Sequence, residues 1–242
     1  MKEEIFPVVI LAGGLATRLR PITEEIPKAL IDIQGKPFIA YQLRLLSESG
    51  IRKVILCVGY RGEIIQDVIG NGTKYNLHIE FSFDGPQLLG TAGSIKKVLY
   101  LLGDHFFVLY GDSFLPCNYR KIQNAFEQID KLAMMSVFRN EGRWDQSNVE
   151  FRDGQILAYD KKHPNPHMQH IDYGLGVFKK ASFQIVPDYQ PYDLDVLYQN
   201  LLNQNELAAY EVKERFYEIG SFSGLEEFRN FIANNLTHYG KP

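Results

Sequence analysis

Short apolar runs alternate with segments of helical periodicity through the first half of this chain. Phe6–Ala12 is an apolar run typical of a buried strand, and Phe38–Leu46 carries apolar residues at helical spacing until Gly50 ends the segment. Because strands that alternate with helices form βαβ units with right-handed crossovers, this pattern predicts an α/β fold with a largely parallel sheet. Further strands are expected at Val54–Val58, Leu77–Phe83, Phe106–Tyr110 and Ala133–Phe138, and further helices at Glu63–Ile69, Ser94–Leu102 and Tyr119–Ile129.

The pattern changes after Arg139. Asn148–Phe151 and Ile156–Asp160 flank the pair Asp153-Gly154, which predicts a β-hairpin with a glycine turn. This second half is expected to build a lid on the first. Its other strands are expected at Ile171–Phe178 and Ala208–Val212, and its helices at Leu194–Leu202 and Gly224–Leu236.

The organisation and charge of the chain narrow its class. No linker, repeat or low-complexity tract interrupts the sequence, so one domain over residues 1–242 is expected. The formal net charge of −3 argues against nucleic-acid binding, which usually needs a broad basic surface. Cys57 and Cys117 lie far apart without a ligand pattern, which favours free thiols in a reducing compartment. No stretch approaches the ~20 apolar residues of a membrane span, so a cytoplasmic protein without membrane partners is expected.

The most informative motif follows the first strand. Gly13 and Gly14 permit a tight turn, in which backbone N–H groups can approach an anion closely. Thr17, Arg18 and Arg20 follow at once, and arginine adds a forked, permanently charged donor suited to a polyphosphate. Taken alone, this segment is equally consistent with a surface turn whose arginines are solvated.

Two charged residues lie in comparable settings. Lys28 follows Pro27 and precedes an apolar run, so it should be held more rigidly than a surface lysine and could meet a transferring phosphate. Asp112 follows the strand Phe106–Tyr110. Because ligands of parallel sheets bind beyond the carboxyl ends of the strands, Asp112 is placed to hold Mg²⁺ against phosphate oxygens. An ordinary exposed lysine and a turn-forming aspartate are the alternatives.

The order and spacing of these motifs resemble the sugar-1-phosphate nucleotidyltransferase family, whose signature is a strand, then G-G-x-G-T-R-L-R-P, then P-K-P. The resemblance covers nearly the whole chain, and it implies a Rossmann-like three-layer sandwich with a mixed, mostly parallel central sheet. Residues 1–139 would bind the nucleotide and residues 140–242 the sugar. The matching segments are Gly13–Pro21, Pro27–Ala29, Gly72, Leu88–Gly93, Gly111-Asp112, Tyr159–Lys161, Ile171–Gly174 and Phe216–Gly220.

The same resemblance implies the chemistry and the site. A nucleotidyl group would pass from a nucleoside triphosphate to a sugar 1-phosphate, with Mg²⁺ as the cofactor and pyrophosphate as the second product. The catalytic residues would be Arg18 and Lys28, and the metal ligands Asp112 and Glu218. The implied nucleotide-binding residues are Leu11, Ala12, Gly13, Gly14, Thr17, Leu89, Gly90 and Thr91. Lys161, Asp172 and Gly174 would bind the sugar phosphate, with Asp172 hydrogen-bonded to a sugar hydroxyl.

Three positions depart from the family pattern. Ala16 replaces the third glycine of the phosphate turn, which we expect to be tolerated if its φ stays negative. Ala29 replaces the second proline of P-K-P, a small loss of stiffness. Glu218 replaces the usual metal-binding aspartate, so its extra methylene must be absorbed by a shifted backbone, and Phe216 stands where tryptophan is common.

The chain most resembles the short bacterial members of the family, which are heptose-1-phosphate guanylyltransferases and N-acetylmuramate-1-phosphate uridylyltransferases. We therefore expect GTP and a heptose or related sugar 1-phosphate as substrates, in the synthesis of a cell-surface polysaccharide precursor. Uridylyl or thymidylyl transfer to another sugar 1-phosphate is the alternative. Apolar positions on the terminal helix would suit a homo-oligomer.

Two other classes of protein fit the sequence less well. A nucleotide-sugar-binding protein without chemistry would not need Arg18, Lys28 and Asp112 intact. An NAD-dependent oxidoreductase would show G-x-G-x-x-G at the start of a helix, whereas here Pro21 interrupts the segment. Among lesser features, Arg139, Arg143 and Trp144 could lie near the sugar, and the loop with His163, His167 and His170 is expected to be solvated or to contact the sugar.

Overall fold

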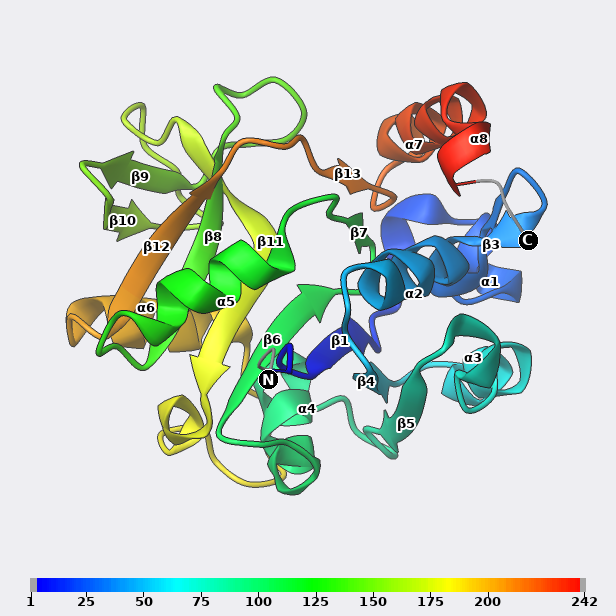
Figure 1. Ribbon diagram of the computed structural model, residues 1–242, viewed down its shortest axis with the longest axis horizontal. Coiled ribbons are helices and arrows are strands. Elements are labelled where there is room, and N and C mark those ends of the chain that lie inside the picture. The colour runs from blue at the N-terminus through cyan, green and yellow to red at the C-terminus, as the bar shows by residue number, and fades with distance from the viewer. Residues whose placement is uncertain (1–3, 240–242) are drawn as a thin grey trace.

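In the computed structural model, which describes residues 4–239, nine strands form one mixed sheet (Figure 1). The strand order is β10-β9-β11-β6-β1-β4-β5, with β8 beside β11 and β12 beside β8. The parallel strands of the first half are β1 (Val8–Ala12), β4 (Lys53–Val58), β5 (His78–Phe83) and β6 (His105–Tyr110). Their apolar, β-branched sequences suit strands that are covered on both faces. The predicted βαβ arrangement is confirmed for this half.

The second half joins the sheet through β11 (His170–Lys179), which runs antiparallel to both β6 and β8 (Ala133–Arg139). β12 (Leu207–Val212) then pairs parallel to β8. β9 (Val149–Arg152) and β10 (Gln155–Tyr159) form the hairpin predicted around Asp153-Gly154. Both halves of the chain therefore contribute strands to one sheet, which makes it mixed as expected.

Helices cover both faces of the sheet. Successive residues of β1 point to opposite faces, and the apolar ones on each face are buried under helices. Val8 and Ile10 pack with α2 (Phe38–Glu48), α3 (Gly62–Ile69) and α5 (Tyr119–Glu127) on one face. Val9 packs with α4 (Gly90–Val98) and α6 (Leu194–Asn203) on the other. These are the three layers of the expected sandwich. α7 (Phe222–Asn234) adds a smaller aromatic core with α2, in which Phe228 contacts Phe38 and Tyr41.

The short elements complete the chain: α7 lies beside the strand β13 (Tyr217–Glu218), and α8 (Leu236–Tyr239) follows α7 and packs against it, as Figure 1 shows. The other short α-helix is α1 (Ile22–Glu25), and the other short strands are β2 (Asp32–Ile33), β3 (Lys36–Pro37) and β7 (Ser113–Phe114). No helix within residues 4–239 is long and apolar enough to cross a membrane.

One boundary prediction was wrong. The helix expected from Ser94 begins at Gly90, because the carbonyl oxygen of Tyr192 accepts hydrogen bonds from the N–H groups of Ala92 and Gly93. These two donors belong to the first turn of α4, where a helix has no partners of its own. A segment about a hundred residues away in the sequence therefore stabilises the start of the helix, which local periodicity cannot reveal.

Candidate active site

A cavity of about 260 Å³ lies beyond the carboxyl ends of β1, β4, β5 and β6. This is the edge at which open α/β sheets bind their ligands. The predicted site residues that line it are Leu11, Ala12, Gly13, Gly14, Lys28, Gly90, Thr91 and Asp112. The sequence motifs separated by up to a hundred residues thus meet in one place.

The turn after β1 packs closely against the backbone that follows β4. A Cβ atom on Gly13 would lie 3.2 Å from the backbone nitrogen of Gly59, so a larger residue would push against β4. The turn ends at Ala16, whose φ is +50°. The condition under which alanine was expected to be tolerated here, a negative φ, is therefore not met. The carbonyl oxygen of Ala16 accepts a 2.9 Å hydrogen bond from the Thr23 hydroxyl, which fixes the turn in this conformation.

Lys28 and Asp112 form the central ion pair of the cavity. Lys28 Nζ lies 2.6 Å from Asp112 Oδ2, and both side chains are about three-quarters covered. Pro27 and the 3₁₀ turn Lys28–Leu30 set the direction of the lysine. Burial alone would raise the pKa of Asp112, but the charge and hydrogen bond of Lys28 outweigh it and hold the pKa below its usual value. Asp112 is therefore a carboxylate at neutral pH.

Glu218 reaches the same place from the far end of the chain. β13 pairs antiparallel with β7, which sets Glu218 opposite Ser113. A Cβ atom on Gly220 would lie 2.5 Å from Glu218 Oε2, 3.1 Å from Arg18 Nη2 and 3.4 Å from Asp112 Oδ2. Three charged side chains therefore surround this glycine. Glu218 accepts hydrogen bonds from the Gly220 N–H and, at 3.0 Å, from the Ser221 hydroxyl.

These contacts fit a hard divalent cation. Within residues 4–239, no three His, Cys, Asp or Glu side chains gather as a ready metal site. Mg²⁺, however, is usually held by one or two carboxylates together with water and substrate phosphates. Burial raises the pKa of Glu218, and the negative charge of Asp112 raises it further. A cation between Asp112 and Glu218 would relieve that repulsion, so the donor set suits magnesium.

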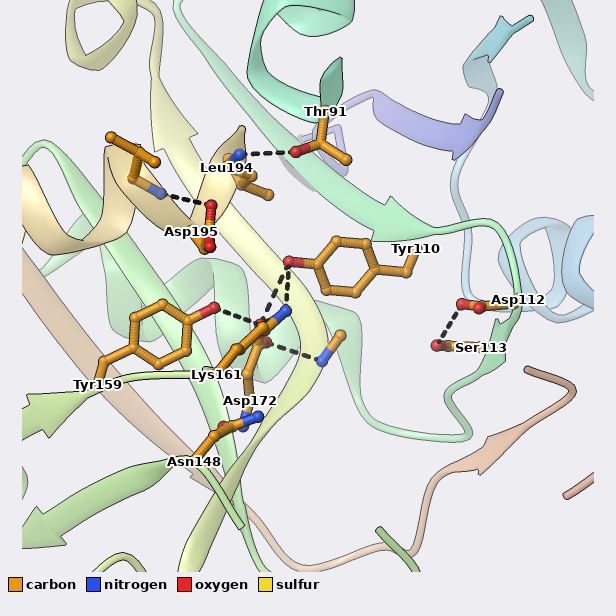
Figure 2. A network of polar contacts seen from close by, with 12 residues as sticks. Thr91, Tyr110, Asp112, Ser113, Asn148, Tyr159, Lys161, Asp172, Leu194 and Asp195 are labelled. Carbon is orange, nitrogen blue, oxygen red and sulfur yellow. Dashed lines mark hydrogen bonds and ion pairs between the residues drawn. The ribbon is translucent and has the colours of Figure 1, made fainter. Parts of the chain in front are cut away.

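A second polar cluster adjoins the cavity through Tyr110, which lines it (Figure 2). Lys161 Nζ lies 3.1 Å from the Tyr110 hydroxyl and 3.1 Å from Asp172 Oδ2. Tyr110 and Tyr159 both donate to the same carboxylate oxygen, at 3.3 and 3.4 Å. Burial raises the pKa of Tyr110, and the Asp172 charge adds to this effect, so the phenol stays protonated. The Asp172 side chain is only 1% exposed, whereas Lys161 is 34% exposed.

The other predicted residues lie around these two clusters. The Thr91 hydroxyl accepts a 2.6 Å hydrogen bond from the Leu194 N–H, and the carbonyl oxygen of Leu89 accepts one from Tyr192. Gly174, with φ +90°, lets β11 pass Tyr110 and Ser113 closely. Thr17 and Arg18 are exposed beside the turn.

The secondary candidates of the second half have structural partners. Arg139 and Arg143 both form ion pairs with Glu141, at 2.8 and 2.6 Å, and both are largely exposed. Trp144 packs against Phe138, and the guanidinium of Arg215 lies 4.4 Å from the centre of its ring.

Sequence reasoning missed several residues that line the cavity. They are Tyr60, Asp84, Leu88, Tyr110 and Asp193. The signal for two of them was present, because Tyr60 follows β4 and Asp84 follows β5. The strand-end argument that identified Gly13 and Asp112 applies equally to these strands. Tyr110 ends β6 and therefore carried the same strand-end signal. Asp193 lies in the second half of the chain and carries no such local signal.

Comparison with known proteins agrees with this geometry. The family model described as nucleotidyl transferase matches residues 7–235. The D-glycero-alpha-D-manno-heptose 1-phosphate guanylyltransferase of Campylobacter jejuni is 28% identical over 94% of this chain and 99% of its own length. The enzyme of the same description from Aneurinibacillus thermoaerophilus is 32% identical over 73% of this chain and 76% of its own. The crystal structure of HddC from Yersinia pseudotuberculosis superposes with a TM-score of 0.79 at 25% identity, covering 94% of this chain and 99% of that one.

Proposed function

The chain belongs to the nucleotidyl transferase family, and we propose that it transfers the guanylyl group of GTP to a heptose 1-phosphate or a closely related sugar 1-phosphate. The products are a GDP-sugar and pyrophosphate. One observation carries the proposal: Lys28, Asp112 and the Gly13-Gly14 turn line one cavity, and Glu218 and Arg18 meet Asp112 beside Gly220. These glycines, cations and carboxylates are the residue types that bind phosphates and Mg²⁺, and they converge on one place.

The reaction begins with a sugar phosphate oxygen that attacks the α-phosphorus of the triphosphate. A bond forms between that oxygen and the α-phosphorus, and the bond from the α-phosphorus to the oxygen bridging the β-phosphorus breaks. Pyrophosphate leaves in line with the attack. The attacking phosphate is already largely ionised near neutral pH, so no general base is required. Catalysis is then mostly alignment and charge stabilisation.

Different residues around the triphosphate align it and stabilise its charge. The backbone N–H groups of the Gly13-Gly14 turn bind phosphate oxygens. The close packing of Gly13 against the backbone of Gly59 holds the turn in position. Arg18 and Lys28 stabilise the charge that develops on the leaving pyrophosphate. The ion pair with Asp112 holds Lys28 at the wall of the cavity, next to the place where the phosphates would bind.

Asp112 and Glu218 would hold Mg²⁺ against phosphate oxygens of the substrates. When bound, the cation neutralises phosphate charge and orients the attacked group. Glu218 can serve despite its extra methylene, because β13 is anchored to β7 and brings the carboxylate next to Asp112.

Lys161 meets the phosphate of the sugar 1-phosphate. Its ammonium group is partly exposed and is oriented by Asp172 and the Tyr110 hydroxyl. Because the Asp172 carboxylate is nearly enclosed by Lys161, two tyrosines and the Gly174 N–H, we propose that it contributes mainly by positioning Lys161.

A pyrophosphate-release assay tests the proposal. The assay compares the rate of pyrophosphate release in the presence of Mg²⁺. Each of the four common nucleoside triphosphates is paired with several sugar 1-phosphates. We expect the fastest turnover with GTP and a heptose 1-phosphate. Arg18→Ala should lower that turnover by about a hundredfold or more, since loss of one transition-state charge contact costs roughly 3 kcal/mol. Arg52→Ala is the matched control, because Arg52 precedes β4 at the opposite edge of the sheet. Near-normal turnover of Arg18→Ala would contradict the assigned role.

A further inference from the structure

Gln42 is a buried residue of α2 whose side chain reaches the end of β6. Its Nε2 donates hydrogen bonds to two backbone carbonyl oxygens, that of Tyr110 at 3.2 Å and that of Ser113 at 2.8 Å. These two residues flank Gly111-Asp112, the turn between β6 and β7. One side-chain amide of α2 therefore spans the turn that carries Asp112.

The turn between β6 and β7 contributes to both polar clusters of the candidate site. At its start, the Tyr110 hydroxyl donates to Asp172 in the cluster that adjoins the cavity (Figure 2). In its middle, Asp112 forms the ion pair with Lys28. Because only Gly111 separates Tyr110 from Asp112, a shift of this turn would move the phenol and the carboxylate together.

Two backbone hydrogen bonds hold the same turn from other sides. The Gly111 N–H donates to the carbonyl oxygen of Leu11 at 3.0 Å, and the Ile219 N–H donates to the carbonyl oxygen of Asp112 at 2.9 Å. The first bond ties the turn to β1, and the second ties it to the residue after β13. Gln42 adds the connection to α2, so three separate parts of the chain set the position of the turn.

The orientation of the Gln42 amide follows from its neighbours. If Oε1 and Nε2 were exchanged, an oxygen would face two carbonyl oxygens, and three acceptors would repel one another. In the orientation found, Oε1 is buried and has no hydrogen-bond donor among residues 4–239. A buried acceptor without a donor costs about as much free energy as one or two hydrogen bonds contribute. The amide consequently adds little net stability, and its main effect is on the geometry of the turn.

We propose that Gln42 is a positioning residue for the transfer reaction, which spans the turn between β6 and β7 and thereby sets Asp112 and Tyr110 relative to the cavity. This inference rests on the proposed function. Gln42 itself does not line the cavity, so it acts through the residues of the turn. Because a displacement of about 1 Å can lower a rate roughly a hundredfold, loss of this amide should lower kcat.

A purely structural role for Gln42 is the alternative, and Gln123 of α5 provides the matched comparison. Gln123 is as deeply buried as Gln42. Its Oε1 accepts a 2.9 Å hydrogen bond from the Phe6 N–H, and its Nε2 donates to the carbonyl oxygen of Glu4 and to Glu127 Oε1. These bonds hold the segment before β1, at the opposite end of this strand from the cavity.

Pyrophosphate release from GTP and a heptose 1-phosphate, together with thermal unfolding, is compared for Gln42→Met and Gln123→Met. Methionine is similar in length to glutamine but donates no hydrogen bond. We expect Gln42→Met to lower kcat by roughly ten- to a hundredfold. The KM for GTP should stay nearly unchanged, because the Gly13-Gly14 turn keeps its own contacts.

Gln123→Met should keep its kcat and show the larger fall in Tm, because both polar atoms of Gln123 have partners in the folded chain. A purely structural role for Gln42 predicts instead that kcat at temperatures well below the Tm is the same in the two variants. That result would overturn the proposal. Should Gln42→Met not fold, the milder Gln42→Asn is compared with Gln123→Asn, because an amide one methylene shorter cannot reach both carbonyl oxygens.

Amide hydrogen exchange gives a second readout that needs no turnover. The N–H groups of Gly111 and Ile219 should exchange faster in Gln42→Met than in the unaltered chain, and at the unaltered rate in Gln123→Met. Equal protection of these two groups in all three proteins would overturn the proposal. If the unaltered chain released no pyrophosphate with any substrate pair, the proposed function would be contradicted, and hydrogen exchange would still decide whether Gln42 holds this turn.

Discussion

At the scale of single residues, Ala16 adopts a backbone conformation that its amino-acid type disfavours. It holds φ at +50° in the turn that leads from Gly14 to Arg18. An L-residue in this left-handed region brings its Cβ close to the backbone, at a cost of roughly 1–2 kcal/mol. The hydrogen bond from Thr23 and the close contact of Gly13 with Gly59 leave the turn little freedom to avoid it.

Ala16→Gly should therefore stabilise the protein. We expect a gain of about 1 kcal/mol, after the larger unfolded-state entropy of glycine is subtracted, and a rise in Tm of about 2–4 °C. Thermal unfolding measures it. Ala40→Gly, within α2, is the matched control and should have the opposite sign, because glycine in a helix interior is unfavourable. A lower Tm for Ala16→Gly would contradict the assigned backbone strain.

Some features of single residues could be predicted from the sequence, and others depend on contacts with distant segments. Gly13, Lys28 and Asp112 could be predicted to meet, because each lies just after a strand or proline that fixes its direction. The positive φ of Ala16 could not, since it depends on Thr23 and Gly59. The enclosure of Asp172 by Tyr110 and Tyr159 depends on contacts between the two halves of the chain and is equally invisible in local patterns.

At the scale of elements, the packing of α6 on β11 depends on a glycine. A Cβ atom on Gly176 would lie 2.2 Å from the Tyr198 hydroxyl and 2.7 Å from Phe178 Cε2. Both side chains are buried in the core between the sheet and α6. Gly176 also pairs with Val108 of β6 and Met135 of β8, so its backbone cannot move away easily.

Gly176→Ala should consequently destabilise the protein by about 1–3 kcal/mol, the usual result of overpacking a core. Denaturant unfolding followed by circular dichroism measures the change. Gly103→Ala is the control, because a Cβ there has no atom within 4 Å, and its stability should stay close to that of the unaltered protein. An unchanged unfolding midpoint for Gly176→Ala would show that α6 adjusts without strain.

Elements with a clear period were predictable, and the shortest ones were not. The long strands and helices follow their apolar patterns to within a few residues, as β4 and α2 illustrate. β7 and β13 have only two residues each, too few to show a period. Their pairing is nevertheless what brings Glu218 to Asp112, so the geometry of this candidate metal site could not be derived from the pattern alone.

At the scale of the whole molecule, one sheet organises both groups of ligands. β6 is flanked by β1, whose turn is the proposed binding place of the triphosphate, and by β11, which carries Asp172. Asp112 and Tyr110 at the end of β6 therefore connect the two polar clusters, as Figure 2 shows. The antiparallel addition of the second half explains how a triphosphate and a sugar phosphate can lie side by side.

The central claim is that a sugar phosphate oxygen attacks the α-phosphorus in this cavity. GTP with oxygen-18 in the bridge between its α- and β-phosphorus atoms, incubated with a heptose 1-phosphate and the protein, tests it most directly. Phosphorus NMR of the products locates the label. We expect the heavy oxygen in pyrophosphate, with an unlabelled GDP-sugar formed in equal amount. Label retained on the guanosine phosphate, or no GDP-sugar at all, would contradict the account.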